Sequence, residues 1–193
     1  MITTRTARQC GQADYGWLQA RYTFSFGHYF DPKLLGYASL RVLNQEVLAP
    51  GAAFQPRTYP KVDILNVILD GEAEYRDSEG NHVQASAGEV LLLSTQPGVS
   101  YSEHNLSKDK SLTRMQLWLD ACPQRENPLI QKLALNMSKQ QLIASPEGGM
   151  GSLPASVAAP YRARQRRKCE FPVAWATRVF AIDSREISCA YAS

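Results

Sequence analysis

The chain has 193 residues, of which 44% are hydrophobic and 20% charged, and its net charge is +3. This composition is typical of a folded domain and excludes a disordered or collagen-like chain. No apolar run reaches the roughly 18 residues that a membrane-spanning helix needs, and the first residues lack the apolar core of a secretory signal. The sequence therefore predicts a cytoplasmic protein without a membrane partner. The four cysteines lie at least 20 residues apart, which predicts neither a zinc site nor a disulfide framework.

Short strands dominate the first two thirds of the chain. Apolar residues recur over Leu40–Leu48, and Val62–Leu69 is a nearly continuous apolar run that suits a strand buried on both faces. Further strands are predicted over Glu72–Arg76, Val90–Leu93 and Leu112–Leu119. Short strands at such even spacing favour an antiparallel barrel or sandwich.

Local signals predict how these strands are connected. Asp70-Gly71 predicts a hairpin, because Gly tolerates the positive φ of primed turns, and Asp77–Asn81 predicts a second turn. Asn127-Pro128 predicts a helix start that leads into Leu129–Leu135, since Asn is a good N-cap and Pro suits the first helical position. Leu142–Ser145 is predicted as a further strand.

The composition changes after Leu153. Residues 1–153 carry 14 Lys/Arg and 15 Asp/Glu, whereas residues 154–193 carry 7 and 3, together with 9 Ala. The last segment shows no sustained period of 2 or 3.6 residues, so we expect an unstructured tail. Its basic run, Tyr161–Lys168, also has the composition of a nucleic-acid-binding arm, but a solvated tail is the simpler interpretation and no nucleic-acid partner is predicted.

Five segments carry a more specific pattern: Gly16–Pro32, Leu40–Asn44, Ile68–Asn81, Gly88–Val90 and Ser102-Glu103. Together they resemble the pirin-like bicupins, and the resemblance covers about residues 1–153 in order. It implies an all-β fold, the cupin or double-stranded β-helix barrel, which this family normally carries twice in one chain.

The resemblance also divides the chain into three parts. Residues 1–125 would form an N-terminal cupin barrel, and residues 126–153 would form a linker helix and the start of a second cupin domain. Residues 154–193 would be the tail.

The resemblance implies a metal site, but most of its ligands are missing here. Iron-binding pirins use a His-x-His pair on one strand and a His-x-Glu pair on another. These positions fall on Arg57, Tyr59, Tyr101 and Glu103, so that only Glu103 matches. Arginine has no lone pair to donate, and phenol is a poor ligand at neutral pH. We therefore expect no metal and no other cofactor.

The same four residues indicate a different kind of site. Arg57, Tyr59, Tyr101 and Glu103 would converge in the mouth of the barrel, where guanidinium and phenol donors suit a small anion or a carboxylate metabolite. The alternative is an ion pair between Arg57 and Glu103 that fills the metal position and binds no ligand.

Cys122 is a redox candidate. It closes the last predicted strand just before Pro123, and Arg125 nearby would lower the pKa of an accessible thiol. An inert, half-buried cysteine fits the sequence equally well.

The tail has a further explanation at the level of the gene. When Val157–Ser193 is back-translated with synonymous codons and read one nucleotide later, one choice of codons yields a string that resembles the family's second domain. We therefore hypothesise that residues after about Leu153 are translated out of frame. A barrel without its partner domain would expose an interface, so self-association is expected.

These features predict a truncated pirin-like protein that binds a small ligand or senses redox stress rather than an enzyme. The alternative is a metal-dependent oxidoreductase of the quercetin 2,3-dioxygenase type, an activity found among pirin-like proteins.

Overall fold

The structure is a computed structural model that describes residues 2–37, 39–121, 129–135, 143 and 189–192. Two antiparallel sheets make up most of it. The strands of the larger sheet are β2 (Gly11–Asp14), β3 (Leu18–Tyr22), β4 (Leu40–Leu48), β6 (Val62–Asp70), β9 (Glu89–Ser94), β11 (Leu112–Asp120) and β12 (Leu129–Ala134). The strands of the smaller sheet are β5 (Ala53–Thr58), β7 (Glu72–Asp77), β8 (His82–Ser86) and β10 (Ser100–Asn105). Outside these sheets lie β1 (Ile2–Arg5), the 3-10 helix η1 (Ala7–Gln9) and β13 (Cys189–Ala192).

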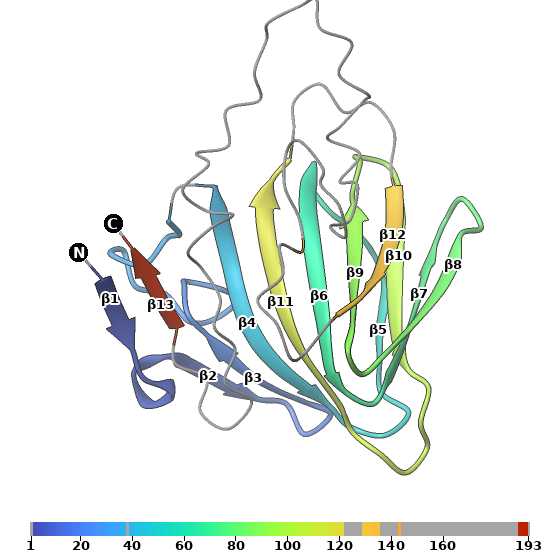
Figure 1. Cartoon of the computed structure of the whole chain (residues 1–193), viewed down its shortest axis with the longest axis horizontal. Helices are drawn as coiled ribbons and strands as arrows, with labels where there is room; N and C mark the ends of the chain where they lie inside the picture. Colours follow the sequence, from blue (N-terminus) through green and yellow to red (C-terminus); the bar gives the residue numbers. More distant parts are fainter. Residues whose placement is uncertain (1, 38, 122–128, 136–142, 144–188, 193) are drawn as a thin grey trace, which may run out of the picture.

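The order of the strands shows how the sheets are assembled. The seven-stranded sheet has the order β12-β9-β6-β11-β4-β3-β2, and the four-stranded sheet has the order β5-β10-β7-β8 (Figure 1). Strands distant in sequence are neighbours, as where β11 lies between β4 and β6. The result is an all-β fold of two antiparallel sheets, which agrees with the cupin barrel that the family resemblance implies.

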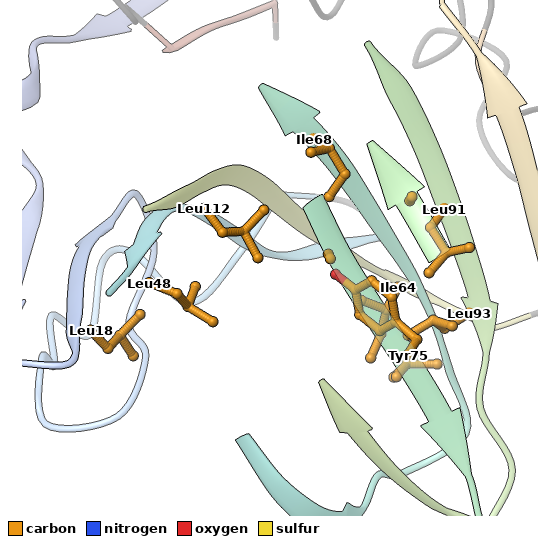
Figure 2. Close-up of a cluster of buried hydrophobic side chains, with 11 residues drawn as sticks. Leu18, Leu48, Ile64, Ile68, Tyr75, Leu91, Leu93 and Leu112 are labelled. Carbon is orange, nitrogen blue, oxygen red and sulfur yellow. The ribbon is translucent and has the colours of Figure 1, made fainter. Parts of the chain in front are cut away.

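The central strands of the larger sheet are buried on both faces. Successive side chains of a strand point to opposite faces, so Ile64 and Ile68 of β6 pack with Tyr75 of the smaller sheet in a core between the two sheets (Figure 2). Leu65 and Val67 point the other way and belong to a second apolar cluster. The predicted burial of this strand on both faces is confirmed, because all residues from Val62 to Ile68 are buried.

The predicted strands agree closely with the observed ones, but the Asp70-Gly71 hairpin is wrong. β6 and β7 belong to different sheets and do not pair. Gly71 does have a positive φ of 87°, yet the chain uses this turn to cross from the larger sheet to the smaller one. By contrast, the turn at Asp77–Asn81 joins β7 and β8, which pair as a hairpin.

The predicted helix over Leu129–Leu135 is also wrong. Leu129–Ala134 forms strand β12, which pairs antiparallel with β9. The edge of β9 offers backbone groups that need partners, and such a non-local pairing overrides a local cap signal. The cap residues Asn127-Pro128 lie outside the described residues.

Four residues of the predicted tail are described by the structure. Cys189–Ala192 forms β13 and pairs antiparallel with β1. The rest of residues 154–193 lies outside the described residues, as does most of the strand predicted over Leu142–Ser145. Within the described part of the chain, no helix has the length and apolarity to cross a membrane.

Candidate functional site

Polar side chains form a row inside the barrel. Gln116 of β11 lies in register between Asn44 of β4 and Asn66 of β6. Further along β11, Arg114 lies opposite Glu46 of β4. All five side chains are buried. Because residues two apart in a strand share a face, the periodicity of the strands brings them together.

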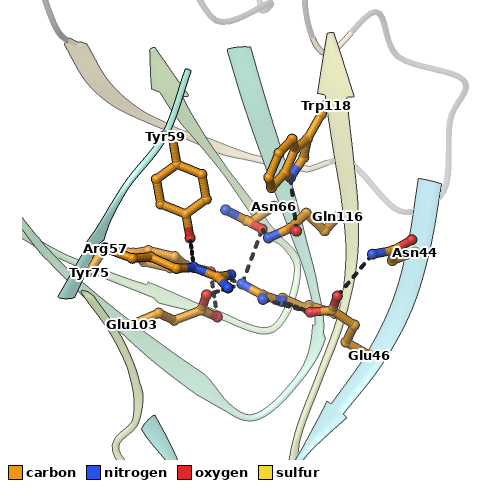
Figure 3. A network of polar contacts seen from close by, with 10 residues as sticks. Asn44, Glu46, Arg57, Tyr59, Asn66, Tyr75, Glu103, Gln116 and Trp118 are labelled. Atoms are coloured by element: carbon orange, nitrogen blue, oxygen red, sulfur yellow. Dashed lines mark hydrogen bonds and ion pairs between the residues drawn. The ribbon is translucent and has the colours of Figure 1, made fainter. Parts of the chain in front are cut away.

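Arg114 is the centre of this polar interior and is 1% exposed. Its Nε and Nη2 atoms donate to Glu46 Oε2 at 3.0 and 2.6 Å. Its Nη1 atom donates to Asn66 Oδ1 at 3.2 Å and to the Tyr75 hydroxyl at 3.0 Å. The same Nη1 forms an ion pair with the Glu103 carboxylate. Arg114 therefore links the larger sheet to β7 and β10 of the smaller sheet. Figure 3 labels its four partners, Glu46, Asn66, Tyr75 and Glu103.

Burial and the ion pairs shift the pKa values of Arg114 and Glu103 in opposite directions. Burial alone would lower the pKa of Arg114, but the carboxylates of Glu103 and Glu46 raise it well above its usual value. Burial raises the pKa of Glu103, although Arg114 counteracts part of this effect. The guanidinium of Arg114 thus stays charged, and its charge stabilises carboxylates that burial would otherwise disfavour.

Arg57 and Tyr59 lie above this interior, where β5 ends. Arg57 Nε donates to the Tyr59 hydroxyl at 2.7 Å. Its guanidinium carbon lies 5.0 Å from the ring centroid of Phe54 and 5.1 Å from that of Tyr59, which are cation–π distances. The rings of Tyr59 and Tyr101 are 6.0 Å apart. Arg57 itself is exposed.

The structure thus gathers the predicted residues but gives Glu103 other partners. Arg57, Tyr59 and Tyr101 form one group, whereas Glu103 lies beneath them and accepts a hydrogen bond of 2.9 Å from the Tyr75 hydroxyl. Among the described residues, the ion-pair partner of Glu103 is Arg114 and not Arg57. The expected ion pair between Arg57 and Glu103 is therefore not formed. The redox candidate Cys122 lies outside the described residues.

The residues at the family's metal positions do not fit a metal. Burial raises the pKa of the Tyr101 phenol to about 12 and also raises that of Tyr59, so both remain neutral hydroxyl groups. Glu103 is the one good donor, and its carboxylate is already bonded to Arg114 and Tyr75. The described residues contain no cluster of three or more His, Cys, Asp or Glu side chains suited to a metal.

Sequence reasoning missed Arg114 and Glu46, although a signal was present. Both lie on buried faces of strands, at Leu112–Asp120 and Leu40–Leu48, where Gln116 and Asn44 are their polar neighbours two residues away. A charged residue on the buried face of a strand needs a charged partner. The sequence therefore indicates that this Arg and this Glu need buried partners, although it does not identify them.

The two sheets and the polar interior between them define a cupin-type barrel protein. The Pirin family model matches residues 3–119. The chain therefore belongs to the Pirin family.

Similar proteins and solved structures agree with this assignment. The chain is 97% identical over 153 residues to the pirin-like protein YhaK of Escherichia coli K12. These residues make up 79% of this chain and 66% of that protein. The crystal structure of YhaK from E. coli, also 97% identical, gives a TM-score of 0.60 and covers 76% of this chain and 65% of the YhaK chain. The chain thus spans about two thirds of the length of this relative.

More distant relatives carry a different description. A protein of E. coli K12 described as quercetin 2,3-dioxygenase is 35% identical over 154 residues, or 79% of this chain and 67% of that protein. The crystal structure of the bacterial pirin YhhW from E. coli in complex with nickel(II), at 35% identity, gives a TM-score of 0.74 and covers 79% of this chain and 66% of that chain. Nickel is thus bound by a relative whose fold is similar.

Proposed function

We propose that this Pirin-family protein binds a small anion, preferably a carboxylate, at the mouth of its barrel and does not perform metal-dependent catalysis there. The observation that supports this proposal is the different state of the two arginines. Arg114 is fully engaged by buried carboxylates, whereas Arg57 forms no ion pair among the described residues and is exposed.

The surroundings of Arg57 suit a planar carboxylate. The hydrogen bond to Tyr59 uses only Nε, so the terminal N–H groups are left to form a bidentate contact with a carboxylate. The rings of Phe54 and Tyr59 flank the guanidinium and would contact an apolar part of the ligand. Arg114 offsets part of the negative charge of Glu103 and Glu46, which reduces their repulsion of an anion at Arg57.

Binding of benzoate and of inorganic phosphate to the purified full chain tests this proposal. We expect weak, saturable binding of benzoate that Arg57→Met reduces by about tenfold or more, since a hydrogen bond to a charged group contributes roughly 1.5–3 kcal/mol. Isothermal titration calorimetry or shifts of NMR signals measures the affinity.

Arg41→Met is the matched control. Arg41 is also exposed, but it is bonded to Asp120 at 2.8 and 2.7 Å and should not affect benzoate binding. Equal affinities of the wild type and Arg57→Met, or no binding of either anion, would contradict the proposal.

The second candidate is a metal-dependent quercetin 2,3-dioxygenase, which is favoured by the description of the relative at 35% identity. This function requires a metal, for which the four family positions offer one good donor. Near-stoichiometric iron, copper or nickel in the purified protein would favour the enzyme over the anion-binding protein. Redox sensing through Cys122 remains a prediction from the sequence, as does the cytoplasmic location in which it would take place.

A further inference from the structure

We infer that Arg114 is a built-in cation: its guanidinium occupies a cation site formed by buried oxygen atoms of both sheets, and the chain itself thereby supplies the positive charge. Such a site closes the barrel interior to a free metal ion. The inference concerns Arg114 and its acceptors, so it is independent of anion binding at Arg57.

The acceptors of Arg114 are held in place by other residues. Glu46 Oε1 accepts a hydrogen bond of 3.1 Å from Asn44 Nδ2, which leaves Oε2 to Arg114. Glu103 Oε1 accepts one of 2.9 Å from the Tyr75 hydroxyl. Each carboxylate is therefore oriented by a second donor and turns its other oxygen toward the guanidinium of Arg114.

The charges require a cation at this place. Glu46 and Glu103 are 3% and 7% exposed. Their carboxylates repel each other, and the charge of Glu46 raises the pKa of Glu103. Two buried carboxylates without a positive partner would either take up protons or destabilise the fold. Arg114 satisfies both with one charge, and its several N–H groups suit acceptors that arrive from different strands.

The atoms around Arg114 also define which free cation could replace it. They are two carboxylate oxygens, the amide oxygen of Asn66 and the hydroxyl of Tyr75. Such an all-oxygen set suits hard cations such as Ca²⁺. The nitrogen-rich ligand set that the family resemblance implies is of a different kind. The site shares Glu103 with the family's metal positions but differs from them in its other donors, and we expect it to accept guanidinium or Ca²⁺ once the Arg114 side chain is removed.

Chemical rescue of Arg114→Ala in the full chain tests this inference. We expect the variant to melt roughly 10 °C below the wild type, as the loss of one partner of a buried ion pair implies. Millimolar guanidinium chloride, far below denaturing concentrations, should raise the melting temperature of the variant in a saturable way, and CaCl₂ should do the same. Neither should stabilise the wild type, and NaCl at equal ionic strength should stabilise neither protein.

Arg41→Ala is the control for the loss of an arginine, because the ion pair of Arg41 with Asp120 is about half exposed. We expect a small loss of stability and no rescue. The double variant Arg114→Ala with Glu103→Gln should be rescued more weakly than Arg114→Ala alone, since one carboxylate of the receptor is gone.

The inference fails if Arg114→Ala is as stable as the wild type, or if neither guanidinium nor Ca²⁺ rescues it. Should Arg114→Ala not fold, Arg114→Lys and Arg114→Gln replace it. The lysine variant, which keeps the charge, must fold and must melt clearly above the glutamine variant. Equal melting temperatures, or a lysine variant that does not fold, would contradict a cation site.

Discussion

Single residues of the barrel show how strongly surroundings decide the role of one side-chain type. Arg114 and Arg57 are chemically identical, but the first is enclosed by acceptors and the second stands among aromatic rings. A buried charge is tolerated only with its partners present, so Arg114 is a structural group. Arg57 is exposed and keeps N–H groups that the proposed anion would bind.

Glu74 provides a pH prediction at the same scale. On the face of β7 opposite to Tyr75, its Oε1 lies 2.6 Å from His82 Nε2, and its Oε2 forms an ion pair with Arg76. Burial alone would raise the pKa of Glu74, but the bonds from His82, Gln84 and Arg76 outweigh this and hold it below its usual value.

A carboxylate with a lowered pKa stabilises the folded chain above its ordinary pKa of 4.5, and this stability is lost as the pH falls through the lower folded value. At neutral pH we expect Glu74→Gln to melt roughly 1–3 °C below the wild type, a difference that should shrink below pH 4.5. Melting curves across this pH range measure it. Glu79→Gln, in the exposed turn nearby, is the control. A difference that is constant or grows in acid would contradict the prediction.

At the scale of elements, the turn between β6 and β7 is the most constrained connection. Gly71 has a φ of 87°, and a Cβ atom there would lie 2.8 Å from the carbonyl oxygen of Ser111. Gly80, in the β7–β8 hairpin, has a similar φ of 90° but no heavy atom within 4 Å of such a Cβ. Substitutions at these two glycines therefore distinguish the cost of backbone strain, which both share, from the cost of steric overlap, which only Gly71 has.

We expect Gly80→Ala to lower the free energy of unfolding by about 1 kcal/mol, the cost of a left-handed alanine. Gly71→Ala carries the same cost plus that of moving the chain at Ser111, and should lose about 2–4 kcal/mol. Urea denaturation measures both values. Equal losses of unfolding free energy in the two variants would show that the chain near Ser111 moves aside without destabilising the fold.

The elements also show how far sequence reasoning extends. The strands β4, β6 and β11 could be predicted because their apolar pattern is local and long. β12 could not, since its strand conformation depends on the edge of β9. In the site, the positions of Arg57, Tyr59, Tyr101 and Glu103 came from the family resemblance. Arg114 was missed because its partners come from four other strands and no motif joins them.

For the whole molecule, the hypothesis of a shifted reading frame makes a prediction about the gene. The 97% identical relative matches 153 residues, the same number as precede the composition change after Leu153. We expect the DNA that encodes residues 154–193 to yield, one nucleotide later, a sequence with the hydrophobic alternation of a second cupin domain. Sequencing the gene measures this directly. Codons that give no such sequence in the shifted frame would exclude the hypothesis.

A repaired gene extends this test to the protein. If the second domain covers an interface of the barrel, the chain with the restored frame should self-associate less than the present chain. Light scattering at several concentrations compares the two. The same oligomeric state for both would show that the present C-terminal residues leave no interface exposed.

The polar row between β4, β11 and β6 also restricts how these strands can align during folding. If β11 were shifted by one residue, every side chain would change faces. Arg114 would then enter the apolar cluster that holds Met115 and Leu117, and Glu46 would face Thr113 or Met115. Leaving such charges buried without partners costs about 3–5 kcal/mol, a large share of the roughly 5–15 kcal/mol that holds a domain together. In a barrel filled with leucine and valine, the same shift would cost little free energy. The buried ions therefore make one alignment of the strands far more stable than the alignments shifted by one residue.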